Sequence, residues 1–281
     1  MSTFITNYGT LILEYIWIPI IIPVLGALGR FIIRDKLLYV KEIKKVSDSE
    51  VEPFSELYNE RINESLRICV EEILQFVGRS KDNAIEHHLY ICKKINKTVG
   101  FIKFMISKEQ KYIFIAYVAV DKNDITAKKY GIKILTRKLA KKYFKPKIAD
   151  CIIVEIEQNP EGTYKTALGS LIARYAKSLG KKSYYIDIPY IQPKMPNENY
   201  QMVDDKFLSL LYIPYFSKDN NRIAKNSLLK IIESIYFEIY EPSCDPSKGC
   251  NCDDYNEYLS NILSIYRDDL DDYIKLIPIE R

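Results

Sequence analysis

The sequence lacks the signatures of several common enzyme classes. It contains no Walker phosphate-binding loop, no HExxH zinc motif and no Ser/His/Asp arrangement, and it has only two histidines, His87 and His88. These absences exclude a P-loop nucleotidase, an HExxH metalloprotease and a triad hydrolase. A strong excess of one charge is also missing, because the net charge is only +4. So mild a balance does not indicate a nucleic-acid partner.

Cysteines are few, and their spacing does not suggest a disulfide framework. Of the six, Cys69, Cys92 and Cys151 stand apart, and isolated thiols in core-like segments suit a reducing compartment. The other three fall in the run CDPSKGCNC at residues 244–252. This cluster is compatible with zinc or with a disulfide, but no fourth ligand is apparent nearby. We therefore expect no metal site.

Lysine and arginine are absent before Arg30, and an apolar run occupies residues 11–33. No charge interrupts it between residues 15 and 29, a length barely sufficient to span a bilayer. Two prolines lie within it, and membrane helices tolerate proline better than soluble helices do. We expect this run to attach the chain to a membrane.

The apolar run has three alternatives to a membrane span. A cleaved signal peptide normally carries positive charge before its apolar run, and here there is none. A buried core helix fits poorly because the folded pattern begins only after the run, whereas a re-entrant or surface-lying segment stays open. The basic residues that follow are Arg30, Arg34, Lys36, Lys41, Lys44 and Lys45. Since positive residues stay inside, residues 1–35 are predicted to be a single-pass cell-membrane anchor with its N-terminus out.

After the anchor, strand and helix patterns alternate. Period-two alternation predicts strands at residues 37–46, 87–95, 98–106, 111–121, 151–158, 183–193 and 207–216. Helical spacing predicts helices at residues 48–78, 130–144, 165–179, 227–240 and 255–276. This order predicts a mixed α/β domain over residues 36–216, with residues 217–281 as a helical extension packed on it.

One segment of this order carries a motif. The string YVAVDKNDITAKKYGIKILTRKL (117–139) resembles the acyl-CoA motif of the N-acetyltransferase superfamily, the GNAT fold. In that motif a Val-x-Val strand leads through a Q/R-x-x-G-x-G/A loop into a helix, whose backbone amides hold the pyrophosphate. Aligning the helix with the motif places Gly131 at its last position, where the family has Gly or Ala. Lys129 then occupies the position of the first glycine of the motif, and Thr126 occupies the position of its Gln or Arg. The resemblance implies acetyl-CoA contacts from Val118, Ala119, Val120, Thr126, Ala127, Lys128, Lys129, Tyr130 and Gly131.

The resemblance extends over roughly residues 38–216. The strings VEIEQNPEGTYKTALGSLIARYAKSLG and YIDIPYIQP are similar to the later half of the superfamily. The resemblance assigns protonation of the departing CoA thiolate to Tyr175 and deprotonation of the amine to Glu155. A backbone N–H near Val118 to Val120 would polarise the carbonyl. A structural alternative exists for each residue: Tyr175 could be a tyrosine packed in the core, and Glu155 could lie on a solvated face of its strand. His87 and His88 are interpreted as structural residues.

Two hypotheses follow. The first is a membrane-anchored N-acetyltransferase that moves an acetyl group from acetyl-CoA to an amine of a small molecule or protein at the cytoplasmic membrane face. The second is a non-catalytic acetyltransferase-like module that acts through its membrane segment, as a homo-oligomer or through partner proteins. The residues at Thr126 and Lys129 favour the second, whereas Tyr175, Glu155 and Gly131 favour the first.

Overall fold

The chain is described here by a computed structural model. It describes residues 38–64, 67–77, 84–144, 147–157, 180–196, 202–215, 221–244 and 250–279, together with residues 169, 172, 173, 176 and 177. The apolar run at residues 11–33 and the predicted Tyr175 lie outside these residues. Within the part that is described, no helix is both long and apolar enough to cross a bilayer.

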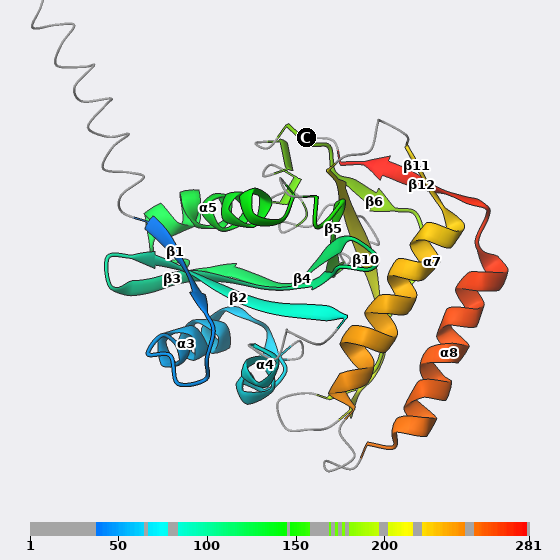
Figure 1. Cartoon of the computed structure of the whole chain (residues 1–281), viewed down its shortest axis with the longest axis horizontal. Coiled ribbons are helices and arrows are strands. Elements are labelled where there is room, and N and C mark those ends of the chain that lie inside the picture. Colours follow the sequence, from blue (N-terminus) through cyan, green and yellow to red (C-terminus); the bar gives the residue numbers. More distant parts are fainter. Residues whose placement is uncertain are drawn as a thin grey trace, which may run out of the picture.

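A ten-stranded sheet is the centre of the described structure, in the order β1-β2-β3-β4-β5-β10-β6-β12-β11 with β7 also paired to β10 (Figure 1). The strands are β1 (Leu38–Ile43), β2 (Ile85–Lys94), β3 (Lys97–Ser107), β4 (Tyr112–Val120), β5 (Cys151–Glu157), β6 (Tyr184–Ile186), β7 (Tyr190–Gln192), β10 (Lys206–Pro214), β11 (Arg222–Ala224) and β12 (Tyr273–Pro278). A separate pair joins β8 (Met195–Pro196) to β9 (Met202–Val203). The fold is therefore mixed α/β with a mixed central sheet, as predicted.

The neighbours β4 and β5 run parallel and separate at their carboxyl ends. Their pairing covers Tyr112–Ile115 against Cys151–Val154, although β4 continues to Val120 and β5 to Glu157. A register shift against β3 makes Ala116 the bulged residue of β4. A bulge bends the strand and strengthens its twist. The two strands thus form a fork that begins after Ile115 and Val154.

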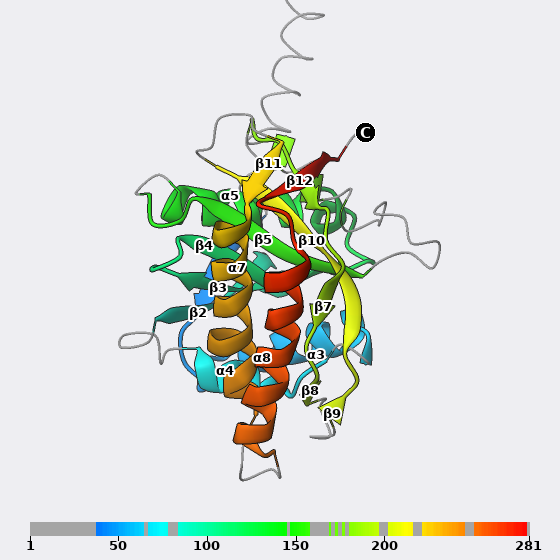
Figure 2. The same ribbon diagram turned by 90° about the vertical axis from the view of Figure 1, so that its right-hand side faces the viewer.

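Helices cover both faces of the sheet (Figures 1 and 2). One face carries α5 (Ile125–Tyr143), whereas α3 (Val51–Arg61) and α4 (Val70–Phe76) pack on the opposite face. That same opposite face is covered farther along by α7 (Lys225–Ser234), the π-helix η3 (Ile235–Tyr240), the 3-10 turn η4 (Glu241–Ser243) and α8 (Cys252–Asp269). Figure 2 shows α7 and α8 side by side, with β7 and β10 beside α8.

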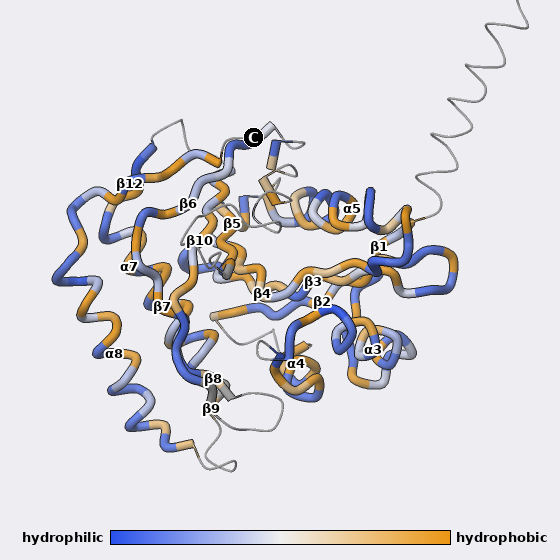
Figure 3. Tube along the Cα trace, turned by 180° about the vertical axis from the view of Figure 1, so that it is seen from behind, coloured by the Kyte–Doolittle hydropathy of each residue, from blue (hydrophilic) through white to orange (hydrophobic). Residues whose placement is uncertain are grey.

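Side-chain alternation along the strands builds the core. On β5, Ile152, Val154 and Ile156 belong to the cluster under α5, whereas Ile153 belongs to the cluster under α7. Figure 3 shows that apolar residues dominate the central strands and that polar residues line much of α8. Burying a side chain such as Ile153 contributes roughly 1.5–3 kcal/mol, so the apolar strands hold the layers together.

The structure corrects three predicted elements. The helix expected from residue 48 to residue 78 is two helices, α3 and α4. The helix expected over residues 255–276 ends at Asp269, and Tyr273–Pro278 instead forms β12 inside the sheet. The helix expected from Tyr130 begins at Ile125, because Asp124 caps it. The C-terminal extension is consequently not only helical, since it contributes two strands to the central sheet.

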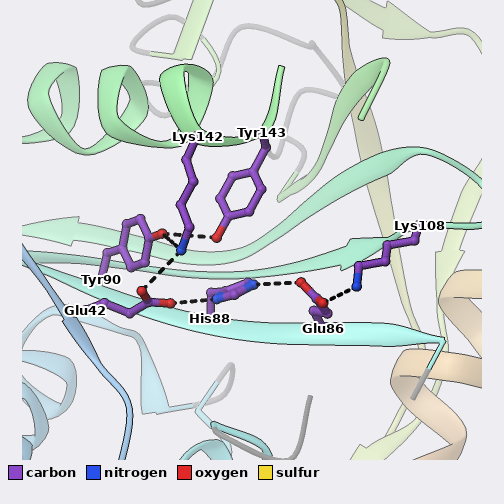
Figure 4. A network of polar contacts seen from close by, with 7 residues as sticks. All are labelled: Glu42, Glu86, His88, Tyr90, Lys108, Lys142 and Tyr143. Carbon is purple, nitrogen blue, oxygen red and sulfur yellow. Dashed lines mark hydrogen bonds and ion pairs between the residues drawn. The ribbon is translucent and has the colours of Figure 1, made fainter. Parts of the chain in front are cut away.

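A polar network joins β1 and β2 to the end of α5 (Figure 4). Its members are Glu42, Glu86, His88, Tyr90, Lys108, Lys142 and Tyr143. His88 Nδ1 lies 2.8 Å from Glu42 Oε1, and Lys142 Nζ lies 3.2 Å from Glu42 Oε2. Burial raises the pKa of Glu42, but the hydrogen bond from His88 and the charge of Lys142 outweigh it and leave that pKa below its ordinary value of 4.5. The network is therefore most stable with Glu42 ionised.

The lowered pKa of Glu42 predicts how acid affects the stability of the fold. A carboxyl whose folded pKa is depressed contributes stability above its unfolded pKa and loses it as the pH falls. We expect Glu42→Gln to lower the free energy of unfolding by about 1–2 kcal/mol at pH 7 and to flatten its decline below about pH 4.5. Urea denaturation across pH 3–7 measures both effects. The same change at Glu56, which is exposed on α3, serves as the control; an equal effect there would contradict this account.

Candidate functional site

Four polar side chains cross one face of the sheet in line: His87 on β2, Lys103 on β3, Tyr117 on β4 and Glu155 on β5. Lys103 pairs with Tyr117, and His87 pairs with Met105, two residues beyond Lys103. Glu155 follows Val154, the last residue of β5 that pairs with β4. We call these four residues the polar row. It ends at the fork between β4 and β5.

The polar row divides two apolar clusters that share its face. One cluster contains Leu89, Phe101 and Ala119 and lies beneath α3 and α4. The other contains Met105, Phe114 and Ile153 and lies beneath α7, η3 and α8. Buried polar side chains cost stability unless they find partners, so a polar line between two apolar clusters marks a candidate site.

Glu155 is the best-connected member of the polar row. Its carboxylate accepts hydrogen bonds from the hydroxyls of Tyr190 and Tyr240, and from Gln192 Nε2 at 3.2 Å. Burial raises the pKa of Glu155 to about 7, against the lowering effect of these hydrogen bonds. A carboxyl that titrates near neutral pH is suited to general base catalysis. The structure therefore gives the predicted Glu155 a half-buried position at the fork, with its carboxylate hydrogen-bonded to three side chains.

The partners of Glu155 were not predicted from the sequence. Tyr190 and Gln192 lie two residues apart on β7 and share a face. Tyr240 ends the π-helix η3, and π-helices occur often at functional sites. From the same π-helix, Tyr236 donates to the Ile191 carbonyl oxygen at 2.6 Å and so holds β7 in place. The only local sequence signal for these partners is the alternation in the string YIQ (190–192), which places Tyr190 and Gln192 on one face of a strand.

Lys103 is buried, with 4% of its surface exposed. Its amine contacts His87 Nδ1 at 3.0 Å and Met105 Sδ at 3.1 Å, and neither atom carries negative charge. Burial lowers the pKa of Lys103 to about 7. Burial and then the charge of Lys103 lower the pKa of His87 to about 2, so this imidazole is neutral. Its ring stacks on Phe76 of α4 with 4.9 Å between centroids.

Tyr117 lies between Lys103 and Glu155. Its phenol is hydrogen-bonded to Tyr58 on α3 and interacts electrostatically with Glu155 and with Glu72 on α4. Burial, then Tyr58, raises the pKa of Tyr117 well above its ordinary value. The phenol therefore keeps its proton at neutral pH, as a proton donor requires.

The predicted cofactor strand borders the fork. Val118 and Val120 turn toward the α5 face, and Ala119 turns toward α3. From Ala116 onward, no described residue of β5 pairs with β4. Main-chain N–H groups on this edge are the kind of donor that polarises a thioester carbonyl. The predicted location of that donor, near Val118 to Val120, is thus a strand edge that faces the fork.

The predicted phosphate loop is wrong in conformation. Residues 126–131 form the first turns of α5 instead of a loop. The Ala127 N–H donates to the Asp124 carboxylate at 2.8 Å, and the Lys128 N–H donates to the Asp124 carbonyl oxygen at 2.9 Å. Asp124 also pairs with Lys94 at 2.7 Å. The amides expected to hold a diphosphate are therefore used by a carboxylate of the chain and by the helix itself.

The remaining predicted contacts lie along α5. A Cβ atom on Gly131 would come within 2.9 Å of Val120 Cγ1, so this glycine allows close packing of α5 on β4. Lys128 and Lys129 are exposed, and Thr126 is half-buried. Lys129 Nζ lies 5.4 Å from the centre of the Tyr130 ring. These side chains offer positive charge, but no amide cradle, to an anion.

The cysteine cluster forms a disulfide between Cys244 and Cys250. Cys252 is a free thiol, as are the isolated Cys69, Cys92 and Cys151. In the part of the chain that the structure describes, no group of three or more His, Cys, Asp or Glu side chains is arranged to hold a metal ion. Of the two alternatives left open for the cluster, the structure has the disulfide.

Comparison with known proteins supports the fold. No protein-family profile matches the sequence, and no protein of curated function matches it. Solved structures do match. A Bacteroides thetaiotaomicron protein assigned to the GNAT acetyltransferase family is 16% identical, with a TM-score of 0.51 over 72% of this chain and 98% of its own. This likeness shows that the chain has the N-acetyltransferase fold.

Two further structures are similar over smaller shares. The ribosomal-protein-S18-alanine N-acetyltransferase of Escherichia coli has 11% identity and a TM-score of 0.40, over 66% of this chain and 98% of its own. A tandem GNAT protein from the clavulanic acid biosynthesis pathway has 13% identity and a TM-score of 0.39, over 53% of this chain. The chain spans about half of that tandem protein, 47% of its length.

Proposed function

We propose that the chain is an acyl-CoA-dependent N-acyltransferase that moves an acetyl group from acetyl-CoA to an amine. The observation that carries this proposal is the half-buried Glu155 at the fork of β4 and β5, held by Tyr190, Tyr240 and Gln192. A strand fork beside a carboxyl that titrates near neutrality joins a place for a thioester to a base for an amine. The N-acetyltransferase fold supports the same reaction class.

The chemistry requires four proton or charge events. Glu155 takes a proton from the substrate ammonium; a carboxylate has about four lone-pair positions, and its three hydrogen bonds leave one of them for this proton. The amine then attacks the thioester carbon, the new C–N bond forms, the C–S bond breaks and the nitrogen releases its surplus proton to solvent. A backbone N–H on the β4 edge stabilises the oxyanion. A phenol protonates the thiolate, a role that the resemblance gives to Tyr175.

The two parts of the predicted cofactor site fit acetyl-CoA differently. The open edge from Val118 to Val120 suits the pantetheine arm because its main-chain groups face the fork. At the start of α5, the Asp124 carboxylate occupies the first-turn amides. The diphosphate would be held by the side chains of Lys128 and Lys129, which add charge without the cradle.

Asp124→Asn tests this arrangement. Asparagine also caps helices, so α5 should keep its start, while one negative charge leaves the place where a diphosphate approaches. We expect acetyl-CoA to bind about three- to tenfold tighter to this variant than to the unchanged chain. Calorimetry with the full chain in detergent measures both affinities. Equal affinities would mean that the diphosphate does not lie at the start of α5.

The capped start of α5 also favours a second candidate function. In that reading the domain keeps the N-acetyltransferase fold without binding acetyl-CoA and acts as a binding or effector module. The capping hydrogen bond from Ala127 to Asp124 is the specific observation. The same calorimetry separates the two functions, because an absence of binding at about millimolar acetyl-CoA contradicts the enzyme and supports the module.

Membrane attachment through residues 11–33 is part of the proposal. The apolar run and the basic residues after it support an N-terminus outside the cell membrane and a cytoplasmic domain. Only residues 34–37 separate Ile33 from Leu38 of β1, so the first strand would lie within about 18 Å of the end of the run. Protease added to spheroplasts should spare the domain; digestion of the domain would contradict this orientation.

A further inference from the structure

Lys103 is the most deeply buried member of the polar row, and the proposed chemistry does not use it. Its ammonium form has no ion pair among the described residues, and its amine meets only His87 Nδ1 and Met105 Sδ. A charged group in such surroundings destabilises the fold because its hydration is lost without a counter-charge. A second member, His87, is neutral and offers no compensation. Lys103 is therefore a cation site that lacks its anion.

The position of Lys103 relates it to Glu155. Both side chains lie on the same sheet face, with Tyr117 between them. The two residues are on strands separated by β4, so their backbones stand at least about 10 Å apart, because neighbouring strands are about 4.8 Å apart where they pair and Glu155 lies just beyond the paired part of β4 and β5. A small molecule with a few carbons between two polar ends spans such a distance. The polar row thus offers a cation at Lys103 and a base at Glu155, with Tyr117 between them.

We infer that Lys103 binds an acidic group of the acceptor, so that the acceptor is an amine that also carries a carboxylate or a phosphate. This inference rests on the proposed function for the role of the amine. The acidic group pairs with the Lys103 ammonium, and the amine of the same molecule reaches Glu155. The polar row lies between the apolar cluster beneath α3 and α4 and the apolar cluster beneath α7 and η3.

Other charged groups around the polar row agree with this assignment. Glu72 on α4 and Glu155 on β5 both interact electrostatically with Tyr117. Their negative charges favour the ammonium end of an acceptor and disfavour a second acidic group near β4. Lys103, one strand farther away, is then the place for the acidic end. Burial also keeps the Lys103 amine poised to gain a proton when an anion arrives, since an adjacent negative charge stabilises the ammonium form.

The experiment compares acids with their uncharged counterparts. The full chain is supplied with acetyl-CoA and with glycine, β-alanine, γ-aminobutyrate or aminoethyl phosphate, each beside its amide or an alkylamine of equal length. We expect kcat/KM to favour the best acid over its uncharged counterpart by about tenfold or more. In Lys103→Met, which keeps the length of the side chain and removes its charge, this ratio should fall to about one. An unchanged ratio in the variant, or no preference in the unchanged chain, would overturn the inference.

A binding measurement separates this inference from the proposed function. If no acceptor is acetylated, the NMR shift of the Lys103 Cε is followed while β-alanine or aminoethyl phosphate is added without acetyl-CoA. A shift toward the ammonium form, absent with the uncharged counterparts, supports the anion site even though the transferase proposal has failed. No shift with either acid overturns the site. The acid that gives the larger response identifies the substituent.

Discussion

Glu155→Gln should reduce acetyl transfer by about a hundred- to ten-thousandfold at neutral pH. Glutamine keeps the size of the side chain but cannot take a proton from the substrate amine. In the unchanged chain, kcat/KM should rise with pH through about pH 7, because burial raises the pKa of Glu155 to about 7 and only the ionised carboxylate acts as a base. The rate at which free CoA thiol is released, followed over pH 5–9, measures this rising limb of the pH profile. It should be absent from the Glu155→Gln profile.

Tyr240→Phe is the matched control for this result. The Tyr240 hydroxyl donates to Glu155, and that hydrogen bond lowers the carboxyl pKa. Its loss should therefore move the rising limb to higher pH while leaving transfer measurable above it. Tyr240 is in this account a positioning residue, and a purely structural role would lower the rate without moving the limb. Unaltered transfer in Glu155→Gln would show that another group is the base.

Lys103→Met should raise the free energy of unfolding, on the order of 2–4 kcal/mol at pH 7. Burial lowers the pKa of Lys103 from 10.5 to about 7, so protonated Lys103 is less favourable in the folded state than in the unfolded state. Between these two pH values the unfolded state binds more protons, and the stability of the unchanged chain should increase with pH. Methionine fills the same space without a charge, and the variant should lack this increase.

Urea denaturation at pH 7 and pH 9.5 measures the effect of Lys103→Met. The comparison is Lys45→Met, at an exposed position, where a change within about 0.5 kcal/mol is expected. A less stable Lys103→Met chain would mean that the amine has a counter-charge in solution, and the argument for an anion site would lose its basis. Stabilisation together with loss of acid preference would identify Lys103 as a residue retained at the expense of stability.

Local pattern predicted the elements better than it predicted the site. Alternation in the string IIVEI correctly placed Glu155 on the face opposite Val154. The partners of Glu155 come from 35 and 85 residues farther along the chain, and no local pattern joins such distant tyrosines. Lys103 was not singled out, because a lysine within a strand is ordinarily expected at the surface. Lys103 is buried by elements that lie far from it in the sequence, and this burial lowers its pKa.

The start of α5 shows a different kind of error. The resemblance to the acyl-CoA motif rests on Gly131 and predicts a loop over residues 126–131, whereas Asp124 predicts that a helix begins directly after it. An aspartate before Ile125 is by itself a good N-cap, and the structure begins the helix there. Gly131 has another purpose, since Val120 leaves no room for a larger residue. A motif placed by one glycine thus conflicted with a stronger helix-start signal seven residues earlier, at Asp124.

The position of β12 inside the sheet has a consequence for the synthesis of the chain. Because β12 lies between β6 and β11, the edge of β6 stays uncovered until residues 273–278 have left the ribosome. An uncovered edge exposes unpaired backbone groups and pairs readily with other chains. Nascent chains that stall or terminate within α8 would therefore present this edge and self-associate. Assembly of this part of the sheet waits for residues 273–278, so a product truncated before them is prone to aggregation from the moment it is released.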